Sequence, residues 1–268
     1  MARYNERKPR EEDVLNRETD NSLLEGRHAV SEALKTGREL DKIYLLRSSA
    51  DEQGDRGLAG IRRMAQAAHI PVVECDRRRM DDMSVTGAHQ GVIAAAPARS
   101  YAQLEDIFAQ AQSRGEAPLI VLCDGLSDPH NLGAIVRTAG AAGAHGVIIP
   151  RHRSVSLTAV TAKAAAGALE HVPVVRVANL PETMKTLQER GVWIFGTAAE
   201  GETALYDADF ARPCAVVIGN EGAGMSRLVR ERCDYIVNIP MRGEVPSLNA
   251  SAAAAVVLFE AVRRRLGR

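Results

Sequence analysis

Short apolar runs alternate with helical patterns throughout the second half of this chain. The runs have the length of strands and lie at 119–123, 146–149, 173–177, 192–195, 215–218 and 235–239. Helical spacing of apolar residues separates them at 131–143, 156–169, 181–190, 224–231 and 249–265. Strands that alternate with helices form a mostly parallel sheet covered on both faces. Residues 118–268 are therefore predicted to be an α/β domain.

A smaller α/β domain is predicted ahead of it, over residues 21–98. Its expected strands lie at 42–46, 71–73 and 91–96, and its expected helices at 26–34 and 55–69. Residues 99–117 read as a polar helical connector, which ends at Gly115 and Pro118. Residues 1–20 contain eleven charged residues and almost no large apolar ones, so we expect a flexible charged arm there.

The composition narrows the class of protein. A hydrophobic content of 46% and a charged content of 25% are those of a globular protein with a real core. No apolar run approaches the roughly 20 residues that span a bilayer, and the N-terminus has no apolar segment of a secretory signal. The four cysteines of the chain have no metal-binding spacing; they are Cys75, Cys123, Cys214 and Cys233. We expect a reduced, cytoplasmic protein without a structural metal.

The net charge does not indicate whether the protein binds nucleic acid, because 34 basic residues balance 34 acidic ones. RNA binding would have to use local clusters at 62–63, 77–79, 151–153 or 263–265, although any one of these is more typical of a solvated face. An aromatic content of 4% argues against a base-stacking platform.

Two junctions between a strand and a loop near the C-terminus are rich in glycine and polar residues. The run 215–218 meets the turn 219–224, Gly-Asn-Glu-Gly-Ala-Gly, and the run 235–239 leads through 240–249 into an alanine-rich helix. Such junctions are typical of a ligand site built from backbone. The turn is not a dinucleotide-binding loop, because it lacks the third glycine and lies near the end of the chain. Helix capping is the alternative role for Glu221, Ser247 and Asn249.

A third junction precedes the predicted helix 131–143. Asn131 stands where that helix begins, a position at which asparagine is most often a cap. Arg137 lies among apolar residues within the same helix. A buried arginine needs an anionic partner, so the residues alone allow an internal ion pair or a contact to a substrate phosphate.

Together these junctions resemble the SpoU (TrmH-type) branch of the SPOUT methyltransferases. These enzymes transfer a methyl group from S-adenosylmethionine to a ribose 2′-hydroxyl of RNA. The spacing from Asn131 to Arg137 is similar to the family's motif 1, the turn 219–224 to motif 2, and the segments 239–241 and 247–249 to motif 3. The resemblance covers about residues 23–265. It is closest to the bacterial 23S rRNA guanosine-2′-O-methyltransferase group, whose small L30e-like RNA-binding domain the segments 24–30 and 89–92 resemble.

The resemblance implies a fold and a set of roles. The second domain would be a SPOUT domain with a C-terminal trefoil knot, which topology rules alone would not predict. Arg137 would be the catalytic arginine, supported by Asn131, with the other catalytic positions at Glu221, Ser247 and Asn249. S-adenosylmethionine would be bound by Thr197, Gly219, Asn220, Gly222, Ile239, Met241 and Leu248. Arg27 and Arg62 would contact RNA.

The function implied is methylation of a 23S rRNA guanosine. The substrate would be free RNA or a ribosomal assembly particle. The enzyme would be a homodimer, with helix 249–265 across its twofold axis. No membrane or DNA partner is expected, and DNA lacks the acceptor hydroxyl. Because a guanidinium is effectively always protonated, we expect Arg137 to position a phosphate and stabilise the developing alkoxide. The runner-up is a tRNA guanosine-2′-O-methyltransferase or an adenosine-specific rRNA relative. The alternative from another class is a ribosome-assembly factor without turnover, and an NAD-binding oxidoreductase is a distant third.

Overall fold

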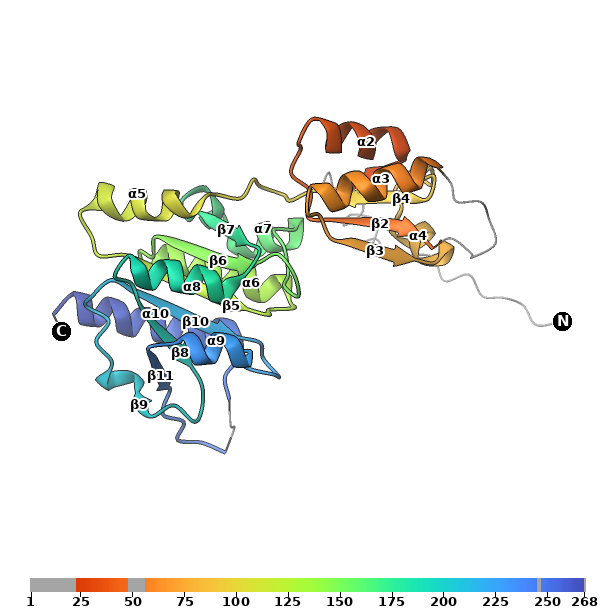
Figure 1. Cartoon of the computed structure of the whole chain (residues 1–268). Helices are drawn as coiled ribbons and strands as arrows, with labels where there is room; N and C mark the ends of the chain where they lie inside the picture. The colour runs from red at the N-terminus through yellow and green to blue at the C-terminus, as the bar shows by residue number, and fades with distance from the viewer. Residues whose placement is uncertain (1–22, 48–55, 245–246, 268) are drawn as a thin grey trace. The chain divides into compact units, whose positions relative to one another are not determined.

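The chain divides into two compact units, Met1–Ala98 and Arg99–Arg268. The computed structural model describes residues 23–47, 56–244 and 247–267 (Figure 1). The charged arm predicted at 1–20 lies outside the described residues.

The first unit is a four-stranded sheet with helices on both faces. The strand order is β1-β4-β2-β3, with β2 parallel to β3 and β4 antiparallel to β1 and β2. Helices α2 and α3 cover the face that carries Ile43 and Leu45, and α4 packs its buried Met80 on the opposite face beside Ile93. The elements are β1 (Leu23–Glu25), α2 (Arg27–Lys35), β2 (Lys42–Leu46), α3 (Arg56–Ala67), β3 (Val72–Cys75), α4 (Arg77–Met83) and β4 (Val92–Ala95).

The second unit is built on a seven-stranded sheet in the order β7-β6-β5-β10-β8-β11-β9. Every strand pairing among the described residues of this sheet is parallel, which confirms the predicted architecture. The register pairs Gly219 with Asp124. The glycine turn 219–224 and the loop that leads from β5 to Asn131 therefore leave the sheet side by side. The strands are β5 (Leu119–Asp124), β6 (Gly146–Pro150), β7 (Val174–Val177), β8 (Trp193–Thr197), β9 (Thr203–Ala204), β10 (Cys214–Gly219) and β11 (Tyr235–Asn238).

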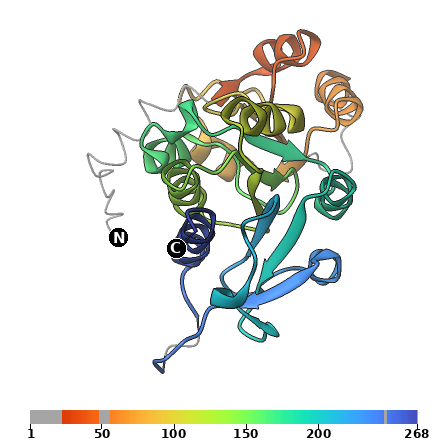
Figure 2. The same cartoon turned by 90° about the vertical axis from the view of Figure 1, so that its left-hand side faces the viewer.

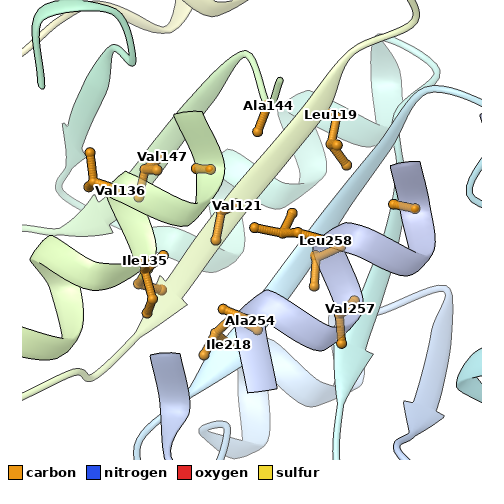
Figure 3. Packing of buried hydrophobic residues seen from close by; sticks show 14 of the residues in the cluster. Leu119, Val121, Ile135, Val136, Ala144, Val147, Ile218, Ala254, Val257 and Leu258 are labelled. Carbon is orange, nitrogen blue, oxygen red and sulfur yellow. The ribbon is translucent and has the colours of Figure 1, made fainter. Parts of the chain in front are cut away.

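Helices cover both faces of this sheet (Figure 2). One face carries α6 (Pro129–Ala141), α7 (Ala159–Ala165) and α10 (Ala250–Arg265); the other carries α5 (Leu104–Arg114), α8 (Leu180–Glu189) and α9 (Arg227–Arg232). Two short 3-10 helices, η1 (Ala168–Glu170) and η2 (Leu205–Asp207), complete the unit. Figure 3 shows the first face, where Val121 and Ile218 of the sheet pack under Ile135 of α6 and Leu258 of α10. No described helix is long and apolar enough to cross a membrane.

The segment expected to be a connector, 99–117, contains α5, and α5 packs on the sheet. Ile107 and Ala111 are buried, and Ile107 belongs to the same apolar cluster as Ile120 of β5. Gly146 makes this possible, because a Cβ on Gly146 would lie 2.5 Å from Ile107 Cδ1. The helix looks polar in sequence because only its narrow inward stripe is apolar.

The C-terminal helix α10 is held at its end by one arginine. The Arg265 guanidinium donates to the carbonyl oxygens of Ala117, Pro118, Phe210 and Arg212 at 2.5, 2.9, 3.1 and 3.1 Å. This side chain therefore ties the last helix to the start of β5 and to the segment before β10. The trefoil knot that the resemblance implies stays a prediction.

Candidate functional site

A cavity of about 420 Å³ opens where β8, β10 and β11 end. Its walls are the loops that follow these strands and the first turn of α10. Ligand sites of open α/β sheets lie at the carboxyl ends of the strands, and this volume is within the range of small-molecule sites. All seven positions predicted to bind the cofactor line it: Thr197, Gly219, Asn220, Gly222, Ile239, Met241 and Leu248. Three chain segments distant in sequence thus meet around one hollow.

The glycine turn 219–224 forms one wall and is closed by its own hydrogen bonds. Asn220 N donates to Gly224 O at 3.0 Å and Gly224 N donates to Asn220 O at 2.9 Å. The Asn220 side chain is committed inside the protein, because its Oδ1 accepts from Gly222 N and Ala223 N and its Nδ2 donates to Gly125 O, each at 3.0 Å. Asn220 therefore shapes the turn, which leaves main-chain groups to face a ligand.

Asp124, for which the sequence predicts no role, anchors the far side of this turn. Asp124 Oδ2 accepts from Ser226 N at 2.6 Å, which ties the start of α9 to the end of β5. An acidic residue at the end of a buried strand was the available signal. Its partner could not be read from the sequence, because the register that sets Asp124 beside Gly219 joins residues far apart in the chain.

Three predicted catalytic residues are joined in a chain of hydrogen bonds beside the cavity. Asn249 Nδ2 donates to Asn131 Oδ1 at 2.9 Å, and Asn131 Nδ2 donates to Glu221 Oε1. Asn131 is only 8% exposed, whereas Glu221 lines the cavity. Asn249 also caps α10, so the capping role and a place in the site coexist. Motifs 1, 2 and 3 are thereby connected through side chains.

The other two predicted catalytic residues are placed differently. Ser247 lines the cavity. Arg137 does not: it is exposed, borders a separate hollow of about 300 Å³ with His171, and has no ion pair within the part of the chain that the structure describes. An internal ion pair was one of the two alternatives for Arg137, and it is wrong. Helical spacing turns the neighbouring Ile135 and Val136 into the core and leaves Arg137 in solvent.

The lining has the mixed chemistry that S-adenosylmethionine requires. Apolar side chains, including Met241 and Leu248 at 37% and 36% exposure, offer a surface for an adenine ring. At the rim, Arg230 Nη1 donates to Glu200 Oε1 at 2.5 Å. The pKa of Glu200 lies below its ordinary value because its own backbone N–H and then Arg230 donate to the carboxylate. These charges suit the amino-acid end of the cofactor, so the residues present fit the group.

In the first unit, the two arginines predicted to contact RNA both have protein partners. Arg27 Nε donates to Gln90 O at 3.1 Å, and Arg62 Nη2 pairs with Glu74 Oε1 at 2.6 Å. Both partnerships are exposed to solvent. Surface pairs of this kind are weak, so their contact with RNA stays a prediction.

Two family profiles match the chain. Residues 118–259 match the SpoU rRNA Methylase family, and residues 23–102 match the profile described as RNA 2′-O ribose methyltransferase substrate binding. The chain belongs to the SpoU rRNA methylase family. This SpoU-family chain is 46% identical to the 23S rRNA (guanosine-2′-O-)-methyltransferase RlmB of Ralstonia nicotianae, over 91% of this chain and 96% of the relative. It is 44% identical to the putative TrmH family tRNA/rRNA methyltransferase YacO of Bacillus subtilis, over 90% of this chain and 94% of the relative.

A similar protein has been solved with its cofactor bound. The SpoU methyltransferase AviRb from Streptomyces viridochromogenes, in complex with AdoMet, is similar with a TM-score of 0.58 and 29% identity, over 92% of this chain and 91% of that one. The protein is thus an RNA methyltransferase of the SpoU family, and its cofactor is S-adenosylmethionine. The roles of individual residues toward that cofactor stay predictions.

Proposed function

We propose that this SpoU-family protein is a ribose 2′-O-methyltransferase that acts on a guanosine of 23S rRNA. The observation that carries the proposal is the cavity with its adjoining chain from Asn249 through Asn131 to Glu221, which joins all three motifs at one hollow. The substrate is argued from the relative named RlmB and from the first unit, which matches a substrate-binding profile. A cytoplasmic location goes with such a substrate.

When bound, S-adenosylmethionine supplies a methyl group activated by its sulfonium. The protein then needs to hold the ribose oxygen in line with that group and to accept a proton nearby. Main-chain groups of the glycine turn and of the segment 239–241 would hold the cofactor. Glu221 and Ser247, which line the cavity, would orient the reacting groups. The proton would pass to a phosphate oxygen or to water, because a guanidinium does not accept one.

Arg137 would act through a phosphate of the RNA. Its exposed guanidinium has no protein partner among the described residues, so it is available to a bidentate anion. In this role Arg137 sets the position of the substrate backbone and stabilises the charge that develops on the attacking oxygen.

We also propose a homodimer that packs through α10. Phe259 on this helix is 50% exposed, and α10 packs directly on α6, which carries Arg137. A second copy would bury this apolar surface and approach the site. Analytical ultracentrifugation should find a dimer that the Phe259→Glu variant weakens, whereas a monomeric wild type at micromolar concentration would contradict the dimer.

The deciding experiment maps ribose methylation of 23S rRNA and tRNA in cells with and without the protein. Loss of one 2′-O-methylguanosine from 23S rRNA, restored by the wild-type gene and not by an Asn131→Ala variant, is the expected result. A lost mark at an adenosine would keep the chemistry and change the base. No lost mark in either RNA would contradict an enzymatic role and favour a ribosome-assembly factor.

The second candidate is a tRNA guanosine-2′-O-methyltransferase. It is favoured by the Bacillus subtilis relative, whose name covers both RNA classes. The same mapping separates the two, because a tRNA substrate would lose its mark from tRNA while 23S rRNA stays unchanged.

A further inference from the structure

Three donors converge on the side-chain oxygen of Asn249, which caps α10. Ser251 N lies 2.9 Å, Ser251 Oγ 2.6 Å and Ala252 N 3.4 Å from Asn249 Oδ1. Two of these donors are main-chain N–H groups, which cannot accept a hydrogen bond. The Asn249 amide can therefore be oriented in only one way, with its oxygen toward the helix and its nitrogen away from it.

This orientation gives the neighbouring hydrogen bonds a direction. Asn249 Nδ2 meets Asn131 Oδ1 at 2.9 Å, which leaves Asn131 Nδ2 to donate to Glu221 Oε1. If the Asn249 amide turned over, its NH2 group would face the N–H donors of the cap. Asn131 would then turn over too and set its oxygen against the Glu221 carboxylate. Asn249 and Glu221 are exposed, but Asn131 between them is only 8% exposed, so an unmatched amide there is costly and the cap favours one direction for the whole chain.

We propose that Ser251 is a positioning residue for the methyl transfer, an inference that rests on the proposed function. Ser251 does not line the cavity. Its hydroxyl strengthens the cap, the cap orients Asn249, and Asn249 makes Asn131 donate to Glu221 Oε1. Within the described residues, Glu221 Oε2 has no hydrogen-bond partner, and Glu221 lines the cavity. The chain thus reserves one carboxylate oxygen to accept a hydrogen bond from the cofactor or from the ribose of the RNA.

The test uses the Ser251→Ala variant, which loses the hydroxyl and keeps both main-chain donors. The kcat for RNA methylation should fall about five- to tenfold, the effect of one hydrogen bond. The Kd for S-adenosylmethionine should stay unchanged, and the Tm should fall by no more than about 2 °C, because both main-chain donors still cap α10. Ser251→Thr restores the hydroxyl and should return kcat to within about twofold of the wild type. The matched control is Ser113→Ala on α5, which removes an exposed hydroxyl that donates to Gln110 O at 2.8 Å and should change none of the three values.

Wild-type kcat in Ser251→Ala, or a loss that Ser251→Thr fails to restore, overturns the proposal. NMR of side-chain amides gives a readout that needs no turnover. The NH2 protons of Asn249 and Asn131 should exchange with water faster in Ser251→Ala than in the wild type, and unchanged exchange overturns the proposal as well. A wild-type protein that methylates neither rRNA nor tRNA would contradict the proposed function, and amide exchange would still decide the part played by Ser251.

Discussion

Replacing Gly219 with alanine tests whether the glycine turn forms the wall of the cofactor site. A Cβ at Gly219 would lie 2.5 Å from the carbonyl carbon of Gly224, 2.6 Å from Met225 N and 2.9 Å from Gly224 O, where ordinary contact begins at 3.4 Å. All three are main-chain atoms, so no side-chain rotation relieves the overlap. The turn itself must move by about 1 Å.

The size of the effect follows from what that movement breaks. The two main-chain hydrogen bonds between Asn220 and Gly224 close the turn, and each is worth about 0.5–1.5 kcal/mol. Overpacking adds about 1–3 kcal/mol. The turn is therefore destabilised by about 2–6 kcal/mol. If the binding free energy loses only the lower figure, about 2 kcal/mol, the Kd for S-adenosylmethionine rises about thirtyfold.

Isothermal titration calorimetry with S-adenosylmethionine measures this directly, with thermal unfolding followed in parallel. Gly222→Ala is the control for the fold, since a Cβ at Gly222 meets nothing nearer than Asn220 Oδ1 at 3.7 Å and should leave Tm unchanged. If Gly219→Ala binds the cofactor within about threefold of the wild type, the turn is not the wall of the site and the reasoning is refuted.

Three further predictions concern Arg137, Arg265 and His145. Arg137→Lys keeps the charge and loses the planar fork, so methylation of RNA should fall by at least about tenfold with the cofactor Kd unchanged; near-full turnover would rule out a bidentate contact. Arg265→Ala removes a donor from four carbonyl oxygens, of which Pro118 O keeps a second donor in Cys214 N, and should lower the free energy of unfolding in urea by about 3 kcal/mol; a loss below about 1 kcal/mol would mean that water replaces the side chain. Burial lowers the pKa of His145 below its ordinary value of 6.5. Protonation therefore favours the unfolded chain, so its stabilisation is complete above pH 6.5 and is lost as the pH falls below that value. Thermal unfolding should show a Tm that falls more steeply below pH 6.5 for the wild type than for His145→Gln, and equal slopes would contradict this.

The central strands of the large sheet, β5, β6 and β10, were predictable because they are buried on both faces. Such strands are continuous apolar runs, and the run 119–123 corresponds to β5 (Leu119–Asp124). Elements with little apolar content gave no such signal. Strands β1 and β9, of three and two residues, and helix α4, whose sequence begins with three arginines, were not predicted. Helix α5 was predicted to be a connector, because a buried stripe as narrow as that of Ile107 and Ala111 barely alters the local composition.

By itself, the sequence determined the fold class and which residues make up the three motifs. Strand length, helical spacing and motif spacing are local properties of the chain. Only the tertiary structure decided which polar groups meet. Asn131 contacts residues that are 90 and 118 positions away, Glu221 and Asn249. It also turned Arg137 out to solvent and gave Arg265 its four carbonyl partners. Contacts of this kind depend on the order and register of parallel strands, which no short segment of the chain encodes.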